Sequence, residues 1–139
     1  IGNFFGAATI LALCWFGGTW HQAGGRWGKV VLDTSLSKLE HPFVEAFFLG
    51  IACNLLVCLA VWVAMSAQDT AGKILGIFFP IMAFVAIGFD HVVANMFFLP
   101  AAIFAGVPDV GWGDAGINWL LAGTGNLVGA VLFVSTSYW

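Results

Sequence analysis

Three long stretches of the chain contain no charged residue. They cover residues 1–25, 46–68 and 115–139. An α-helix needs about 20 mainly apolar residues to cross the hydrocarbon core of a bilayer, and each stretch is long enough for one crossing. The pattern therefore predicts three membrane-spanning helices, over about residues 2–20, 42–67 and 117–139.

The stretch between the first two of these helices is more polar. Residues 21–41 include five charged side chains: Arg26, Lys29, Asp33, Lys38 and Glu40. Their spacing predicts a loop that contains a short amphipathic or interfacial segment. Pro42 follows, and proline suits the first turn of a helix because its missing N–H would have no partner there. A short polar turn at residues 68–73 follows the second helix.

The apolar stretch at residues 74–104 has an unusual length. As one straight helix its 31 residues would measure about 46 Å, which exceeds a bilayer core of about 30 Å, whereas two separate full spans would each be too short. Its middle carries Asp90, His91 and Asn95. We therefore predict one span made of two partial helices with non-helical backbone at residues 88–91. Such breaks occur where they are buried or line a polar cavity.

Composition agrees with a membrane protein and excludes other classes. Hydrophobic residues make up 61% of the chain and charged residues 8%, compared with about 25% charged in an average soluble domain. A soluble domain of this size could not bury so much apolar surface. The net charge of −3, without a basic stripe, excludes nucleic acid as a partner.

The sequence indicates neither a metal site nor an enzyme active site. Cys14, Cys53 and Cys58 lie inside apolar runs without the spacing of metal ligands, and we interpret them as buried thiols. No nucleophile and base stand in a catalytic arrangement. We therefore expect no cofactor and no enzymatic activity.

A weak internal repeat links the first and last predicted helices. The sequence GNFFGA at residues 2–7 matches GNLVGA at residues 125–130. Both contain two glycines four residues apart, a spacing that lets membrane helices approach closely. Coincidence is the alternative, because Gly and Ala are abundant here. A true repeat would pair the last helices of two three-helix units that are inverted in the membrane, with two further helices preceding residue 1.

Polar side chains inside the predicted spans are the candidates for function. An ionisable pair such as Asp90-His91 is costly within a membrane, so a functional role is the first hypothesis and a structural or interfacial role is the alternative. Asn95, four residues after His91, would share its helix face. Asn54 either lines a pore or joins two helices. Lys38 either attracts anions to a pore mouth or is an ordinary interfacial lysine.

Several segments resemble the formate/nitrite transporter family. The sequences FVEA at residues 43–46 and GIACNLLVCLAVW at 50–62 resemble the family's fourth helix. FVAIGFDHVVANM at 84–96 resembles its broken fifth helix, and GNLVGA at 125–130 resembles its sixth. The motifs are long and ordered, and the resemblance covers nearly the whole chain from the third helix onward.

This resemblance implies an aquaporin-like fold of six spans in two inverted repeats, assembled as a homopentamer with one pore in each protomer. The chain would be a single transmembrane domain fragment of about four spans, one of them broken. Its parts would be the third helix of the first repeat at residues 1–20, the loop at 21–41 and the second repeat at 42–139.

The resemblance also implies roles for single residues. His91 matches the family's central pore histidine, while Asn54 and Lys38 match a pore-facing asparagine and the lysine upstream of it. Phe84 and Val57 match positions that form two hydrophobic constrictions.

The expected function is selective passage of a small monovalent anion, such as formate or nitrite, through the inner or plasma membrane of a cell. Hydrosulfide and short monocarboxylates are alternative substrates. Asp90 stands where the family most often has glutamate, which keeps the charge with a shorter reach.

A neutral-solute channel of aquaporin type is disfavoured because no Asn-Pro-Ala motif occurs. A haem- or quinone-binding subunit of a redox complex would use His21, His41 and His91, which lie at different predicted depths.

Overall fold

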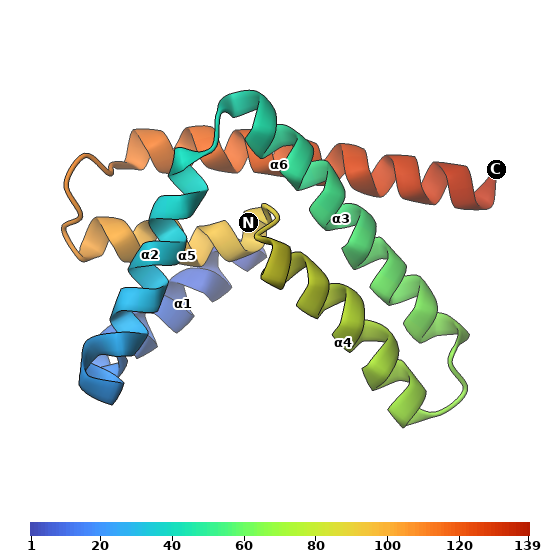
Figure 1. Cartoon of the computed structure of the whole chain (residues 1–139), viewed down its shortest axis with the longest axis horizontal. Helices are drawn as coiled ribbons and strands as arrows, with labels where there is room; N and C mark the ends of the chain where they lie inside the picture. Colours follow the sequence, from blue (N-terminus) through green and yellow to red (C-terminus); the bar gives the residue numbers. More distant parts are fainter. The chain divides into compact units, whose positions relative to one another are not determined.

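The computed structural model describes residues 1–139, with the exception of the Tyr138 side chain. Helices make up all the regular structure of the described part of the chain, which confirms the all-α class. The elements in Figure 1 are α1 (Gly2–Phe16), the 3-10 helix η1 (Thr19–Gly25), α2 (Arg26–Glu40), α3 (Phe43–Ser66), α4 (Thr70–Ile87), α5 (Val92–Phe104) and α6 (Trp112–Tyr138).

Three of these helices, α3, α4 and α6, are long and apolar enough to cross a membrane. The expected break is confirmed, because α4 ends at Ile87 and α5 begins at Val92. The expectation that neither half could span alone is wrong for α4, whose 18 residues meet the length of a span. The helix begins inside the predicted polar turn because the Asp69 side chain accepts a hydrogen bond from the Gly72 N–H at 2.8 Å.

Two further helix boundaries differ from the prediction. The first helix stops at Phe16 rather than near residue 20, because two glycines follow it, a residue type that favours helix ends. The last helix starts at Trp112 rather than near residue 117. Asp114 stabilises this early start, since its Oδ2 accepts from the N–H of Gly111 at 2.9 Å, as in half of a capping box.

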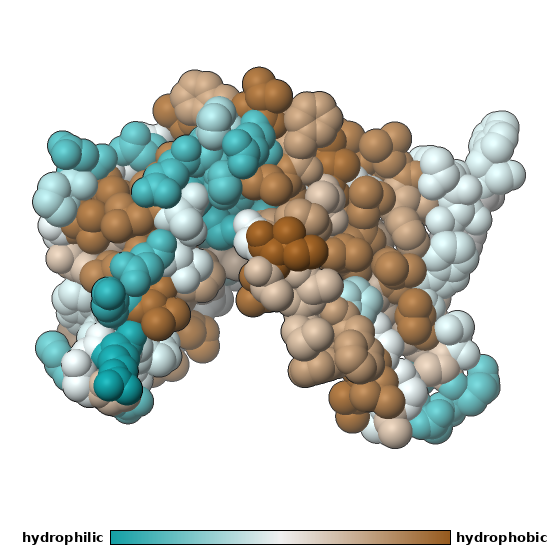
Figure 2. Space-filling view, viewed as in Figure 1, coloured by the Kyte–Doolittle hydropathy of each residue, from teal (hydrophilic) through white to brown (hydrophobic). Residues whose placement is uncertain are grey.

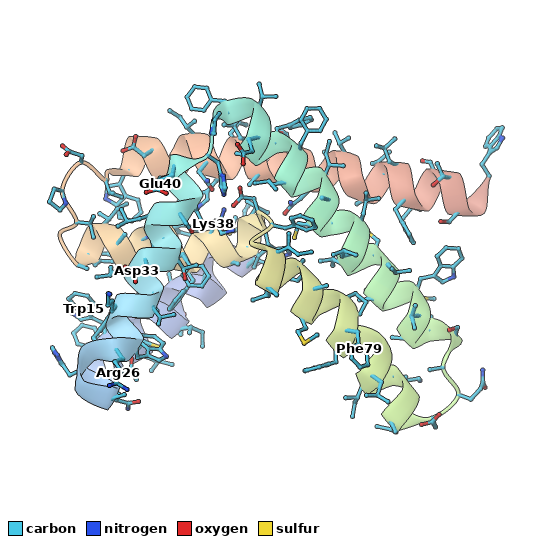
Figure 3. The ribbon with its side chains drawn as sticks, viewed as in Figure 1. Trp15, Arg26, Asp33, Lys38, Glu40 and Phe79 are labelled. Carbon is cyan, nitrogen blue, oxygen red and sulfur yellow. The ribbon has the colours of Figure 1, made fainter. Side chains whose placement is uncertain are left out.

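The predicted loop at residues 21–41 is shorter than expected, because its amphipathic segment is the 15-residue helix α2. Figure 3 labels four charged side chains of this helix: Arg26, Asp33, Lys38 and Glu40. Its buried residues are Gly28, Val31, Ser35 and Lys38. This inward face has helical spacing but includes only one large apolar side chain, so the sequence pattern indicated an amphipathic segment without showing its full length.

The structure divides into two compact units, and the first consists of Ile1–Phe43 and Val92–Leu120. Here α1 and α2 both contact α5. The core contains Leu11, Val31 and Ala101, with aromatic side chains around them. Trp20 packs edge-on against Trp27, with ring centroids 5.5 Å apart.

The second unit consists of Val44–His91 and Leu121–Trp139. Within it, α3 and α6 touch through glycines. A Cβ atom added at Gly125 or Gly129 would overlap backbone carbonyl groups of α3, and one added at Gly50 would lie 2.9 Å from a carbonyl oxygen of α6. The glycine spacing in the last helix therefore serves close helix approach. At Gly2 and Gly6, an added Cβ would meet no described atom within 4 Å.

Apolar side chains cover the outside of α3 and α4. Every residue of α4 is at least partly exposed within the chain, including Ile74, Phe78 and Phe79. In Figure 2 the surface over these helices is brown, while hydrophilic colour gathers along α2 and at the turn that joins α3 to α4. Apolar surface of this extent is suited to contact with lipid or with other membrane helices. The protein is therefore an integral membrane protein.

Candidate functional site

The backbone between α4 and α5 leaves the helical path at Gly88. This residue has a φ of +86°, and its N–H donates to the Phe84 carbonyl at 3.1 Å. The Phe89 N–H reaches the same carbonyl at 3.0 Å. This pair of bonds closes a helix that ends in a left-handed glycine. The following residues are non-helical, so Asp90 and His91 belong to neither helix.

Gly88→Ala should destabilise the protein by about 1–2 kcal/mol, because a left-handed backbone brings a Cβ too close to the following carbonyl oxygen. The measurement is the thermal unfolding midpoint of the purified full-length protein in detergent. Gly116→Ala is the matched control, since Gly116 lies inside α6 where an added Cβ meets no described atom within 4 Å. Its midpoint should stay constant or rise. Equal midpoints for both variants would show that the left-handed turn is dispensable.

Asn126 of α6 holds the break in place within the second unit. Its Nδ2 donates to the backbone carbonyl of Asp90 at 2.8 Å and to that of Gly50 at 2.9 Å, which uses both N–H groups of the amide. Asn54 of α3 donates to the backbone carbonyl of Asn126 at 2.6 Å. Asp90 is fully buried and Asn126 is 5% exposed, so water does not compete for these bonds.

His91 lies against Phe84 of α4. The two rings are stacked, with centroids 5.7 Å apart and an interplanar angle of 28°. Both residues are half-buried. The imidazole nitrogens can exchange hydrogen bonds with a ligand, whereas the phenyl ring offers an apolar wall. This pairing can strip water from a small solute and replace part of the lost hydration with one donor.

Val57, the other residue expected at a constriction, also belongs to the second unit. It lines an apolar cavity of about 270 Å³ whose described residues come from α3 and α6. The cavity also includes Trp62 and Phe133, whose rings meet edge-on at 5.5 Å. The structure thus brings Phe84 to His91, and Val57 lines this cavity between α3 and α6.

The first unit contains a second set of buried polar contacts, at the end of α2. Lys38 lies in the last turn of this helix and is only 8% exposed, which is unusual for lysine. Its backbone carbonyl accepts from Nδ2 of Asn118 at 3.0 Å. The Oδ1 of Asn118 accepts in turn from Nδ2 of Asn95 at 2.8 Å. These bonds join α2, α5 and α6 within the first unit.

Sequence reasoning missed two asparagines of α6, Asn118 and Asn126, as site residues. Around Asn126 lie the predicted residues Asn54 and Asp90, and around Asn118 lie Lys38 and Asn95. The signal that could have revealed both is an amide inside an uncharged apolar stretch. A buried amide needs hydrogen-bond partners, so it marks a place where helices are tied together.

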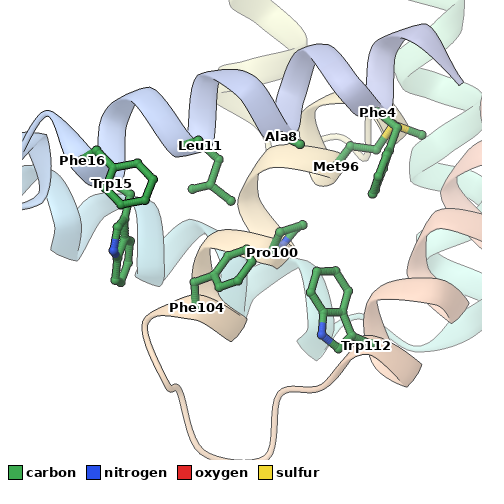
Figure 4. Close-up of a pocket in the computed structure, with 10 residues that line it drawn as sticks. Phe4, Ala8, Leu11, Trp15, Phe16, Met96, Pro100, Phe104 and Trp112 are labelled. Atoms are coloured by element: carbon green, nitrogen blue, oxygen red, sulfur yellow. The ribbon is translucent and has the colours of Figure 1, made fainter.

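An apolar pocket of about 440 Å³ lies in the first unit, between α1, α5 and the start of α6 (Figure 4). Its ten lining residues are all apolar, among them Leu11, Phe104 and Trp112. Such a lining cannot replace the hydration of an anion, so the pocket is unsuited to one. Among the described residues, no group of three or more His, Cys, Asp or Glu side chains could hold a metal ion.

Comparison with known proteins agrees with the resemblance in the sequence. The sequence profile of the family "Formate/nitrite transporter" matches residues 1–139. "Uncharacterized transporter YrhG" of Bacillus subtilis (strain 168) is 52% identical over 114 residues, a match that covers 82% of this chain and 42% of that protein. "Formate channel FocA" of Escherichia coli (strain K12) is 37% identical over 158 residues, covering 99% of this chain and 55% of FocA.

A solved structure also matches. It is described as "Pentameric formate channel with formate bound", and its TM-score to this chain is 0.93 at 33% sequence identity. The match covers 99% of this chain and 61% of that chain. The chain thus spans about half the length of the relatives it matches.

Proposed function

Because this chain belongs to the formate/nitrite transporter family, we propose that it forms part of a pore for small monovalent anions such as formate or nitrite. The observation that carries the proposal is the helical break, which releases His91 from regular backbone and stacks it against Phe84. The proposal concerns the complete protein, since this chain spans about half the length of its relatives.

The mechanism follows from the cost of desolvating an anion. Lys38 attracts the anion through its positive charge, which lies at a helix end. Phe84 and Val57 supply the apolar constrictions where the anion sheds water. His91 then donates a hydrogen bond to the anion or gives it a proton, and either step offsets part of the lost hydration.

The amides and the carboxylate of the proposed pore support His91. Asn54 and Asn95 hold helices of the proposed pore, since Asn54 donates to the Asn126 carbonyl and Asn95 donates to the Asn118 side chain. Asp90 keeps a carboxylate next to the imidazole in sequence, and its backbone is held by Asn126.

A flux assay in liposomes tests the proposal. The full-length protein should pass formate and nitrite faster than glycerol, with hydrosulfide and acetate as further anions in the same assay. A pH gradient separates an open channel from a proton-coupled carrier, because only the carrier would move formate against its own gradient. Equal passage of glycerol and formate would instead favour a neutral-solute channel and overturn the proposal.

We further propose that the protein assembles as a homopentamer in the cell membrane, inner or plasma. A similar solved protein is described as pentameric, and the exposed apolar surface of α3 and α4 offers area for contacts with lipid or neighbouring subunits. Native mass measurement of the full-length protein in detergent should give five copies. A stable monomer under mild conditions would contradict this assembly.

Lys38→Ala should lower formate flux by roughly 3- to 10-fold at about 10 mM ionic strength, because electrostatic steering acts over roughly 30 Å in such dilute salt. At about 1 M salt the steering range falls to roughly 3 Å, so the difference from the wild type should shrink, although less than for an exposed lysine because Lys38 is mostly buried. Lys29→Ala is the matched control, since Lys29 is an exposed lysine of the same helix that pairs with Asp33 at 4.0 Å. Flux that is unchanged at both salt concentrations would show that Lys38 does not attract the anion and is an ordinary interfacial lysine.

A further inference from the structure

The Asn118 side chain has only one orientation that satisfies its partners. A backbone carbonyl accepts but cannot donate, so the atom 3.0 Å from the Lys38 oxygen must be the amide nitrogen. The amide oxygen then faces Asn95, which donates to it at 2.8 Å. Asn118 is 5% exposed and Asn95 is fully buried, so both bonds are shielded from water.

The carbonyl that Asn118 holds belongs to the end of a helix. The last four carbonyl groups of an α-helix have no partner inside the helix, and α2 ends at Glu40, two residues after Lys38. The next residue, His41, has an extended backbone, so the helix does not continue past Glu40. Asn118 supplies a donor to one of these carbonyl groups.

A second polar anchor lies one turn earlier on the same inward face of α2. The hydroxyl group of Ser35 lies 2.6 Å from the backbone carbonyl oxygen of Phe98 in α5 and 2.7 Å from that of Val31 in α2, so the two oxygens share its one proton. Ser35 is fully buried. Ser35 therefore ties the body of α2 to α5, and Asn118 ties the end of α2 to α6. These two contacts fix the position of the last turn of α2. That position sets the direction in which the Lys38 side chain leaves the backbone.

We propose that Asn118 is a positioning residue for Lys38, which sets how far the lysine charge reaches toward an incoming anion. The inference rests on the proposed anion-attracting role of Lys38. Lys38 is only 8% exposed, so a shift of its helix end would change how much of the residue meets solvent. The field that an anion meets depends steeply on such a change, because charges interact far more strongly away from water.

The test is a double-mutant cycle in the full-length protein, read as formate flux into liposomes at low and high salt. The single variants are Asn118→Leu and Lys38→Ala, and the double variant combines them. Thr136→Val is the matched control, because Thr136 is an exposed polar residue of the same helix whose hydroxyl donates within its own turn. Native mass measurement confirms assembly of each variant, and Asn118→Ala replaces Asn118→Leu where the larger side chain prevents assembly.

Asn118→Leu should lower flux at low salt by roughly 2- to 5-fold and weaken its salt dependence, as a partial form of the Lys38→Ala effect. The double variant should match Lys38→Ala alone, because residues that act through one another are not additive. A loss that is equal at all salt concentrations and multiplies with that of Lys38→Ala would overturn the positioning role. If Lys38→Ala itself left the salt dependence intact, the proposed role of Lys38 would fail and this inference with it.

Discussion

His91→Phe is expected to lower selective formate and nitrite flux by at least about 10- to 100-fold while the assembly stays folded. A hydrogen bond to a charged group contributes about 1.5–3 kcal/mol, and each 1.4 kcal/mol is a tenfold change. Phenylalanine has a similar volume and can still stack on Phe84, so the change removes the donor and the proton source but keeps the apolar contact. The measurement is initial anion flux into liposomes over a range of pH.

His91→Asn separates the two ways in which His91 could act. Asparagine keeps a donor but cannot titrate, so flux that persists without pH dependence would favour hydrogen bonding over protonation. His21→Phe is the control, because it makes the same substitution at an exposed position of η1. Wild-type rate, selectivity and pH profile in His91→Phe would mean that His91 is structural and that the mechanism is wrong.

Gly129→Val is expected to prevent stable assembly, at a cost of about 3 kcal/mol or more, because it overpacks a contact between two helix backbones. A Cβ at this position would overlap the carbonyl oxygen of Ile51 in α3. Neither partner is the mobile end of a side chain, so α3 and α6 must move apart. That shift would also stretch the bonds from Asn126 to the carbonyls of Gly50 and Asp90. The readouts are the yield of folded protein in detergent and its unfolding midpoint.

Gly116→Val is the matched control for this substitution. It makes the same change of residue in the same helix, at a position where an added Cβ meets no described atom within 4 Å. Helix propensity therefore changes equally in both variants, and their difference isolates the contact between helices. Similar yields and midpoints for the two variants would show that the close approach of α3 and α6 contributes little.

The sequence by itself determined the helical class, the membrane setting and the position of the break. These properties are local. The length of an uncharged run can be compared directly with the length that a membrane span needs. The pair Asp90-His91 interrupts an apolar stretch that is too long for one helix. Gly88 strengthens the break because its backbone adopts the left-handed conformation at the end of α4. The long motifs around His91 were also sufficient to identify the family, which the match over residues 1–139 confirms.

Only the tertiary structure decided the extent of α2 and the partners of the buried amides. The inward face of α2 is made of Gly28, Ser35 and Lys38 beside a single valine, and such residues become a buried face only when neighbouring helices supply partners. Asn118 reaches a carbonyl 80 positions away in the chain, and Asn126 reaches one 36 positions away. A hydrophobic pattern records which residues avoid water along one element. It does not record which distant backbone groups need a donor, and that requirement depends on how the chain folds.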